Sequence, residues 1–479
     1  MTHFMPPQFT AALPEIFVLL MIVVIMMADL FFGEKRRLIA YGLTQLTLVV
    51  AFALTFQQLS LGTLTTFNGL YIVDPLAIIG KLFILALSVF VFVYSRDYIP
   101  THHMPRGEFH LLGLFSILGM MVLVSSASFL SLYLGLELLS LPLYAMVALK
   151  RDAAISSEAA MKYFVMGALA SGMLLYGISM LYGAADSLSF VTVAQVIHQT
   201  SDAHRLILIF GLIFVIAGTL FKLGAAPFHM WVPDVYEGAP TAITLFITTA
   251  PKIAGLIMLL RLLVDAMPGL VLQWQPILIA IAVLSITLGN FIAITQSNIK
   301  RMFAYSSIAH MGYLLLGVIA ATPLGYSASL FYIFSYAIMA AGAFGLLTLL
   351  SHAGCEVENI SDLQGLNTRN PWLALMMLII LFSMAGIPPT LGFFAKLGVL
   401  EALVKVHFVA LAVYAIVLAL VGAYYYLRVV KVMYFDEPHD ATPIASTMDR
   451  NVAISINGLA IVALGIFPNA LIMLCRSVF

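Results

Sequence analysis

Fourteen apolar segments, most of them about 20 residues long, follow one another along the chain. A helix of that length and character crosses the roughly 30 Å hydrocarbon core of a bilayer. The segments cover residues 13–32, 38–57, 76–95, 111–126, 129–149, 160–182, 205–223, 240–264, 275–296, 303–320, 324–351, 371–387, 407–434 and 452–475. The sequence therefore predicts an all-α polytopic membrane protein of about fourteen transmembrane helices. Thirteen is the alternative, because only Ser125–Ser128 separates the fourth and fifth segments.

Composition supports this class and excludes several others. Hydrophobic residues make up 62% of the chain and charged residues 9%, whereas soluble proteins carry about 25% charged residues. The formal net charge is zero, which argues against nucleic acid as a partner. The two cysteines, Cys355 and Cys475, are too few for an iron–sulfur cluster held by this chain alone. Neither a glycine-rich nucleotide loop nor an arrangement for covalent catalysis stands out.

Basic residues in the loops predict the orientation, because lysine and arginine accumulate on the cytoplasmic side. With the N-terminus outside, thirteen basic residues are cytoplasmic and four lie on the opposite side. The cytoplasmic set is Lys35, Arg36, Arg37, Arg96, Arg106, Lys150, Arg151, Lys300, Arg301, Arg369, Arg428, Lys431 and Arg450. The opposite set is Arg205, Arg261, Lys405 and Arg476. We therefore expect both termini on the outer side.

Two stretches, residues 205–237 and 371–404, are too long and too interrupted to be simple spans. Gly224, Pro227 and Pro233 interrupt the first stretch; Gly386, Pro388, Pro389 and Gly392 interrupt the second. A matched pair of broken helices is typical of transport sites in internally repeated carriers. Because the breaks lie five spans apart, on helices 7 and 12, they predict two inverted five-helix repeats formed by spans 4–8 and 9–13. Ordinary kinking by glycine and proline remains the alternative reading.

The repeat divides the chain into four parts. Residues 1–110 carry helices 1–3, and residues 111–264 form the first five-helix unit. Residues 275–434 form the second, inverted unit, and residues 435–479 carry the last helix. Within these parts we expect the functional groups to be the ionisable side chains that lie inside the spans.

Five lysines lie inside predicted spans, where a charge near the bilayer centre costs between ~3 and more than 10 kcal/mol. They are Lys81, Lys162, Lys222, Lys252 and Lys396. Lys252 is at the middle of its span, too deep for its ammonium group to reach the interface. Lys222 precedes the first break and Lys396 follows the second, so these three lysines are candidates for proton relay. Lys81 is near the outer end of its span, where we expect it to extend toward the interface.

A glutamate and two histidines complete the candidate set. Glu137 is in the middle of the fifth span without another charge on its helix, and Lys222 is its expected partner. Lys162 follows Glu158 by four residues and is either a relay group or an ordinary surface ion pair. His229 lies at the first break and His310 within a span, where each could relay protons or only form hydrogen bonds.

These residues lie in motifs that resemble a known family. The stretch PFHMWVPDVYEGAP (residues 227–240), the preceding GTLFKLG, and the segments LELLSLPLY and NIKRMFAYSSIAHMGY are similar to the antiporter-like subunit N family of the bacterial proton-pumping NADH–quinone oxidoreductase, respiratory complex I. More distantly, the chain resembles subunits of cation/proton antiporters and membrane-bound hydrogenases. By motif, Glu137, Lys222, Lys252 and Lys396 correspond to the family's glutamate and lysines on helices 5, 7, 8 and 12. A lysine at the last of these places favours subunit N over subunit M.

The resemblance implies a proton-translocating subunit of the bacterial inner membrane, part of an enzyme but without a redox centre of its own. It implies that FMN, iron–sulfur clusters and quinone are bound by other subunits, and that the partners of this chain are other membrane subunits, the lipid bilayer and protons. The alternative is a subunit of a cation/proton antiporter or hydrogenase. An antiporter needs a cation site, usually built from carboxylates and carbonyls, and one central carboxylate among several lysines fits a proton relay better. A structural scaffold is a third reading, which the buried charges disfavour.

Overall fold

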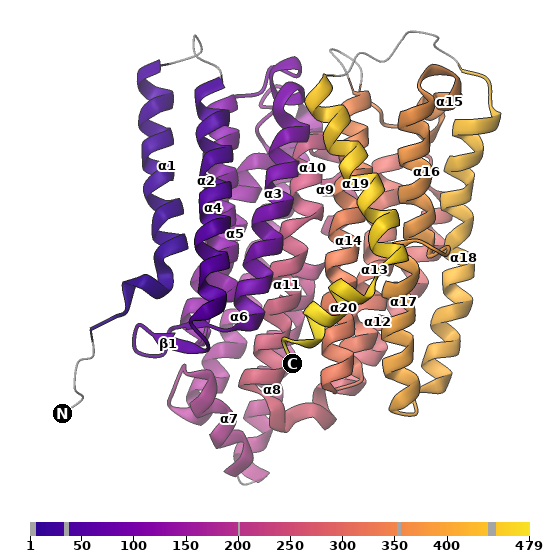
Figure 1. Cartoon of the computed structure of the whole chain (residues 1–479). Helices are drawn as coiled ribbons and strands as arrows, with labels where there is room; N and C mark the ends of the chain where they lie inside the picture. The colour runs from indigo at the N-terminus through magenta and orange to yellow at the C-terminus, as the bar shows by residue number, and fades with distance from the viewer. Residues whose placement is uncertain (1–5, 33–37, 200–201, 352–355, 439–446) are drawn as a thin grey trace.

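The computed structural model describes residues 6–32, 38–199, 202–351, 356–438 and 447–479. Lys35, Arg36, Arg37 and Cys355, which the sequence reasoning used, lie outside them. The described chain is a bundle of long helices running in nearly the same direction, with α1 (Leu13–Phe32) at one flank and α18 (Val409–Phe435) at the other (Figure 1). The described part contains thirteen helices long and apolar enough to span a membrane.

The helices follow the predicted segments closely. The N-terminal group is α1, α2 (Leu38–Gln57) and α3 (Pro75–Thr101), with a hairpin of β1 (Leu64–Thr66) and β2 (Tyr71–Val73) between the last two. The first unit contains α4 (Arg106–Val124), α5 (Phe129–Val147), α6 (Ala154–Ala185), α7 (Phe190–Gln199), α8 (Asp202–Leu223), α9 (Trp231–Gly238), α10 (Thr241–Thr248) and α11 (Ala250–Leu260). The second unit and C-terminal part contain α12 (Val271–Thr295), α13 (Ile299–Ile319), α14 (Pro323–Leu350), α15 (Leu366–Arg369), α16 (Pro371–Ala385), α17 (Leu391–Lys405), α18, α19 (Met448–Ile466) and α20 (Asn469–Arg476).

Both expected breaks are present and share the same construction. α8 ends at Leu223 and α16 at Ala385, and each is followed at once by a glycine with positive φ, Gly224 at 74° and Gly386 at 87°. Glycine adopts this left-handed conformation without steric penalty and commonly ends helices. The helices α16 and α17 are the two halves of the interrupted stretch expected over residues 371–404. Together with the thirteen longer helices, α16 makes a fourteenth apolar helix.

Two details of the predicted spans are wrong. The eighth span is not continuous, because α10 and α11 meet at Thr249, whose φ and ψ of −107° and −101° do not belong to a helix. The predicted last span over residues 452–475 is two helices: α19 ends at Ile466, and Pro468 precedes the separate helix α20. Proline cannot continue the hydrogen-bonding of a preceding turn, which is the physical reason for the second division.

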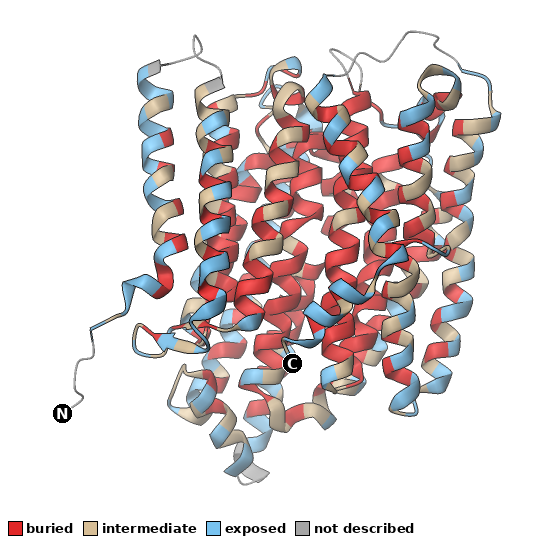
Figure 2. Cartoon of the chain, viewed as in Figure 1, coloured by how far each residue is buried: buried red, intermediate tan, exposed pale blue. Residues whose placement is uncertain are grey.

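The most deeply buried helices are α10, α11, α13 and α14, whereas α1, α2, α18 and α19 expose apolar side chains on their outer faces (Figure 2). Exposed leucine, valine and phenylalanine on such faces suit contact with lipid or with another membrane subunit. The ionisable groups described next therefore lie in the interior of a bundle that is apolar both inside and outside.

Candidate functional site

Lys222 is held by hydroxyl groups of a neighbouring helix. It occupies the last turn of α8, and its ammonium group donates to Ser140 Oγ and to Tyr144 Oη on α5, both at 3.0 Å. Glu137 lies on α5 one turn before Ser140, so it is on the helix that faces Lys222. The expected direct pair is not formed: among the ion pairs of the described residues none joins Glu137 and Lys222, and the ammonium group contacts the two hydroxyls instead. Glu137 Oε1 is buried without a hydrogen-bond partner in the described structure.

Lys252 lies at the first break, near the start of α11. Its side chain is 1% exposed, and its ammonium group donates at 2.7 Å to the carbonyl oxygen of Leu223, the last residue of α8. The indole ring of Trp231 lies 5.3 Å from the same nitrogen. The C-terminal end of a helix carries free carbonyl groups and partial negative charge, so it stabilises a cation. Because α8 ends at Leu223, the free carbonyl group at its end accepts the hydrogen bond of the Lys252 ammonium group.

Lys396 repeats this arrangement at the second break. It lies on α17, and its ammonium group donates to the carbonyl oxygens of Met384 at 3.1 Å and Ala385 at 2.8 Å, the last two residues of α16. The ring of Tyr313 lies 5.3 Å from the nitrogen. Each unit therefore places one lysine on the carbonyl end of its broken helix, with an aromatic ring beside it.

The two histidines have different surroundings. His310, on α13, is 3% exposed and lies between Tyr332 and Tyr426, whose hydroxyls are 2.7 Å from Nδ1 and 3.1 Å from Nε2. His229 lies in the segment between α8 and α9, is 8% exposed, and has a buried Nδ1 without a hydrogen-bond partner in the described structure. His310 is thus part of a hydroxyl network in the second unit, and His229 has a free nitrogen at the first break.

Lys162 differs from Lys222, Lys252 and Lys396 in its contacts and its exposure. Its ammonium group contacts Glu158 on its own helix and Asp234 on α9, both at 2.9 Å, and 42% of its side chain is exposed. Arg301 joins the same group by contacting Asp234 at 3.0 Å and Glu237 at 2.7 Å. The expected pair with Glu158 is present, and Asp234 is a partner that helical spacing alone could not reveal.

The expectation that Lys81 extends to the membrane interface is wrong. Its side chain is fully buried, its ammonium group lies 2.7 Å from a carboxylate oxygen of Glu15 on α1, and it donates to Tyr71 Oη at 2.8 Å. A buried charge is tolerated when it is paired and hydrogen-bonded. The presence of Glu15 near the outer end of the first span was the sequence signal for this pair.

Arg261 and Lys300 are also not loop residues. Arg261 begins a π-helical turn (Arg261–Ala266) after α11, is 3% exposed, and contacts Asp74 at 2.6 Å and Asp265 at 2.9 Å. Lys300, in the first turn of α13, is 2% exposed and lies 3.4 Å from Glu356. Basic residues at helix ends were counted as loop residues because hydropathy alone cannot show what packs against a helix end.

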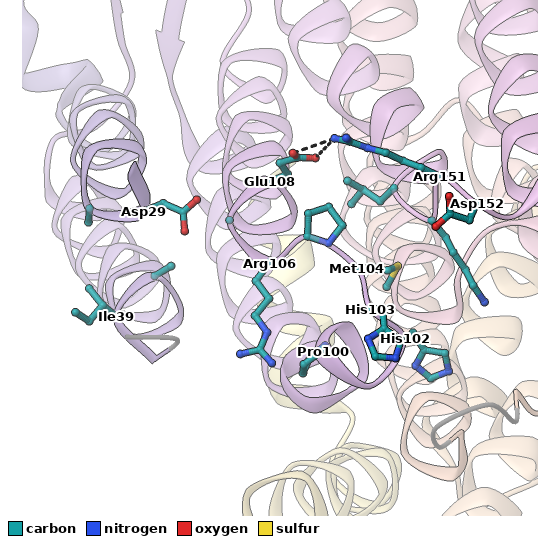
Figure 3. Close-up of a pocket in the computed structure, with 16 residues that line it drawn as sticks. Asp29, Ile39, Pro100, His102, His103, Met104, Arg106, Glu108, Arg151 and Asp152 are labelled. Carbon is teal, nitrogen blue, oxygen red and sulfur yellow. Dashed lines mark hydrogen bonds and ion pairs between the residues drawn. The ribbon is translucent and has the colours of Figure 1, made fainter. Parts of the chain in front are cut away.

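A polar cavity of about 940 Å³ opens at the end of the bundle that carries most of the basic residues (Figure 3). It is lined by charged and histidine side chains from α1, the α3–α4 connection, the first turn of α4 and the α5–α6 connection: Asp29, His102, His103, Arg106, Glu108, Lys150, Arg151 and Asp152. Arg151 and Glu108 form an ion pair of 3.0 Å there. Within the described ranges, no group of three or more His, Cys, Asp or Glu side chains is arranged as metal ligands would be.

A family model and curated relatives match this chain over most of its length. Residues 126–422 match the family model described as NADH:quinone oxidoreductase/Mrp antiporter, TM. The chain is 54% identical over 478 residues to NADH-quinone oxidoreductase subunit N of Coxiella burnetii, covering 99% of both chains. It is 54% identical over 471 residues to the subunit of the same name from Thioalkalivibrio sulfidiphilus, covering 98% of each.

Solved structures show the same fold. A chain of respiratory complex I from Thermus thermophilus with bound aureothin superimposes with a TM-score of 0.82 at 30% identity, covering 97% of this chain and 99% of that one. A chain of the Mrp complex from Dietzia superimposes with a TM-score of 0.86 at 17% identity, over 98% and 97% of the two chains, and shows the fold alone. With its two broken helices and the lysines seated on them, this chain therefore belongs to the NADH:quinone oxidoreductase/Mrp antiporter transmembrane family and, within it, to the subunit N family of NADH-quinone oxidoreductases.

Proposed function

We propose that the chain translocates protons across the bacterial inner membrane as a subunit of an NADH:quinone oxidoreductase. In this proposal, electrons pass from NADH to quinone in partner subunits that hold FMN and iron–sulfur clusters, and this chain carries protons only. Its partners are the other membrane subunits, which would cover part of the exposed apolar faces of the outer helices.

The observation that carries the proposal is the set of three interior lysines without a carboxylate in direct contact. The ammonium groups of Lys222, Lys252 and Lys396 contact hydroxyl or carbonyl oxygens, and no ion pair among the described residues includes them. Neutral oxygen atoms offset only part of the cost of burying a charge, which is several kcal/mol per ion. A lysine in such a place can hold a proton and release it when its surroundings change slightly.

Lys252 and Lys396 occupy matching places in the two units, which suggests a path along the bundle interior. Protons would pass from Lys222 through Lys252 toward Lys396, with Glu137 adjusting the charge near the first lysine. His310 and His229 are proposed as relay groups and Lys162 as a contributor at the edge of the site. The division into units at residues 111–264 and 275–434 belongs to the same proposal.

A cation/proton antiporter is not favoured as a second function. The relatives at 54% identity are named as subunits of an NADH-quinone oxidoreductase, whereas the likeness to the Mrp complex at 17% identity concerns the fold only. A cation/proton antiporter must bind Na⁺ or K⁺ in its interior. The ammonium groups of the interior lysines would repel such a cation.

The test is replacement of the central lysine. Lys252→Ala should leave the complex assembled but lower NADH-driven proton uptake and NADH–quinone turnover together, measured in membrane vesicles containing the whole complex. Lys405→Ala is the control, because the side chain of Lys405 is 58% exposed and pairs only with Glu401 on its own helix. An assembled Lys252→Ala complex with normal turnover and normal proton uptake would contradict the proposal.

Orientation is tested separately. We propose that both termini are on the periplasmic side, in agreement with the distribution of basic residues in the loops. A cysteine introduced at position 2 or at position 479 should react with an impermeant thiol reagent added from the periplasmic side. Protection of both positions would reverse the proposed orientation.

A further inference from the structure

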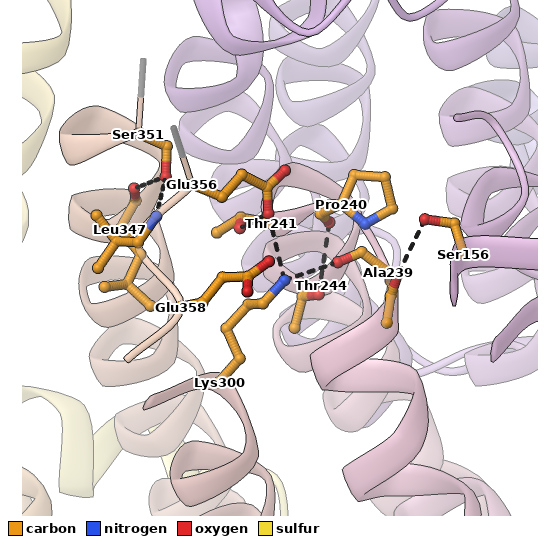
Figure 4. Close-up of polar contacts among 12 residues, drawn as sticks. Ser156, Ala239, Pro240, Thr241, Thr244, Lys300, Leu347, Ser351, Glu356 and Glu358 are labelled. Carbon is orange, nitrogen blue, oxygen red and sulfur yellow. Dashed lines mark hydrogen bonds and ion pairs between the residues drawn. The ribbon is translucent and has the colours of Figure 1, made fainter. Parts of the chain in front are cut away.

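A buried polar cluster lies where the C-terminal end of α3 meets the N-terminal ends of α10 and α13, at the same end of the bundle as the polar cavity. Glu356 is at its centre: the ammonium group of Lys300 lies 3.4 Å from Oε2, and the Tyr98 hydroxyl donates a short hydrogen bond to Oε1. Thr241 Oγ1, at the start of α10, donates to Oε2 at 3.4 Å (Figure 4). His102 Nε2 lies 3.8 Å from Oε1.

This cluster is connected to the polar cavity. His102 is one of the residues that line the cavity (Figure 3), and its Nε2 lies 3.8 Å from a carboxylate oxygen of Glu356. The side chain of Glu356 is 14% exposed, whereas Lys300 and Tyr98 are 2% and 1% exposed. Protons from the aqueous side can therefore reach Glu356 through His102 or directly.

The helix α10, whose first residue Thr241 contacts Glu356, leads to the central lysine. α10 runs from Thr241 to Thr248, a length of about 12 Å at 1.5 Å per residue. Lys252 lies four residues beyond its last residue, just after the break at Thr249. The cluster and the central lysine thus lie near the two ends of one short helix.

One face of this helix carries a row of hydroxyl groups. Thr241, Thr244 and Thr248 are spaced i, i+3 and i+7, which places them on the same side of a helix. All three are fully buried. Thr244 donates to the carbonyl oxygen of Tyr236 at 3.1 Å and Thr248 to that of Leu245 at 3.0 Å. Because a hydroxyl both donates and accepts, a row of hydroxyls can pass a proton by accepting one and giving up its own.

We propose that Glu356 and His102 form the proton-accepting site on the cytoplasmic side and that the threonine face of α10 delivers these protons to Lys252. A proton from water binds His102 Nε2 or the Glu356 carboxylate. Water molecules bridge the successive hydroxyls in this proposal: each hydroxyl or water accepts a proton on one side and releases its own on the other, so that one proton arrives on the neutral amine of Lys252 and no other bond changes. Lys300 is a positioning residue, because it contacts Glu356 and also donates at 3.1 Å to the carbonyl of Ala239, next to the start of α10. This inference rests on the proposed function.

The charges around the accepting site agree with this role. Burial alone would raise the pKa of Glu356, but the nearby Lys300 ammonium group, the Tyr98 hydroxyl and Lys150 together hold it below its ordinary value. Burial lowers the pKa of His102. At neutral pH the carboxylate is therefore ionised and the imidazole is neutral, and both are in the form that accepts a proton.

The test uses the whole complex in inverted membrane vesicles, with NADH-driven proton uptake and NADH oxidation measured as initial rates from pH 6 to pH 9. Thr248→Val and Glu356→Gln should each lower both rates by roughly tenfold or more, as expected for loss of a proton-transferring group. Glu356→Asp should regain much of the rate, because it keeps an ionisable carboxyl group. Thr244→Val removes a second hydroxyl of the same row. It tests the path if the Thr248→Val complex does not assemble, and it should lower both rates in the same way.

Matched controls separate a proton path from loss of packing. Thr55→Val removes a fully buried hydroxyl with the same backbone hydrogen bonding on α2, away from the cluster. Glu358→Gln removes an exposed carboxylate two residues from Glu356. If Glu356→Gln and Thr248→Val pump like these controls while Lys252→Ala does not pump, the intake path is wrong and the proposed function stands. If Lys252→Ala also pumps normally, the proposed function itself fails.

Discussion

The ammonium group of Lys222 donates to the hydroxyl of Tyr144 at 3.0 Å, although the carboxylate of Glu137 lies on the same helix as that tyrosine. Tyr144 and Ser140 therefore hold Lys222 in a place where it feels the charge of Glu137 without forming an ion pair. A small displacement of α8 relative to α5 would exchange the hydroxyl contacts for the carboxylate. The break directly after α8 is the point at which the backbone would take up this movement.

This arrangement predicts that Glu137 and Lys222 act as a switch. Glu137→Gln and Lys222→Ala should each lose most NADH-driven proton uptake in an assembled complex. In a double-mutant cycle on the uptake rate, the coupling energy should exceed ~1 kcal/mol. Tyr144→Phe should have a smaller effect, because Ser140 still accepts a hydrogen bond from Lys222. Strictly additive effects of the Glu137 and Lys222 variants would show that the two side chains act independently.

The pair of Lys81 and Glu15 predicts a structural effect. Lys81→Met leaves the Glu15 carboxylate buried beside Tyr71 without its cation, which typically costs ~3–5 kcal/mol. The double variant Glu15→Gln with Lys81→Met should recover much of this loss, because both charges are then removed. The measurement is the thermal unfolding midpoint of the purified complex, with proton uptake as the second readout. If the double variant is as unstable as Lys81→Met, the ion pair is not the cause.

Asp74 predicts a pH dependence of stability. Burial would raise the pKa of Asp74, but the Arg261 guanidinium group, the Ala77 backbone N–H and Lys81 hold it below its ordinary value. A lowered folded-state pKa means that the stabilisation is fully present above the unfolded value of about 3.9 and is lost as the pH falls through the folded value. Asp74→Asn keeps a good helix-capping side chain but removes the charge, and should cost about 1.5–3 kcal/mol. The difference in unfolding midpoint from the wild type should be the same at pH 6 and pH 8; a steady change over that interval would contradict the assignment.

The sequence alone predicted the positions of the spans and of the two helix breaks, because these depend on hydropathy and on residues that end helices. Apolar length located the spans, and the glycines and prolines at residues 224–233 and 386–392 located both breaks, because proline cannot continue a helix and glycine commonly ends one. The embedded lysines were found because the cost of burying a charge makes each of them conspicuous.

Contacts between helices distant in the sequence could not be predicted. Lys252 donates a hydrogen bond to the backbone carbonyl of Leu223. Every residue has such a carbonyl, so the identity of the side chain gives no indication of the contact. Lys300 and Arg261 were read as loop residues because each is at a helix end, where hydropathy does not distinguish a solvated charge from one covered by another helix. The break at Thr249 had a signal that the prediction did not use, because Pro251 is in the first turn of α11, where proline commonly begins a helix.

The last prediction concerns Gly386, which ends α16 directly before the path reaches Lys396. With φ at 87°, an alanine at this position costs roughly 1–2 kcal/mol in backbone strain. Its Cβ would also lie 2.9 Å from Cδ and 3.3 Å from Nζ of Lys396, closer than atoms in ordinary contact. Gly386→Ala should therefore displace the ammonium group from the carbonyl oxygens of Met384 and Ala385. We expect an assembled complex whose proton uptake and NADH–quinone turnover fall together.

Gly398→Ala is the matched control. Gly398 lies on α17, the helix that carries Lys396, and an added Cβ would meet only the Cβ of Ala328, at an ordinary distance of 3.7 Å. Alanine in the middle of this helix should be neutral or stabilising by up to about 1 kcal/mol. If Gly386→Ala and Gly398→Ala both pump at the wild-type rate, the seat of Lys396 on the carbonyl end of α16 is not needed for proton transfer. A loss confined to Gly386→Ala would instead tie proton transfer to the way the broken helix presents its last two carbonyl groups.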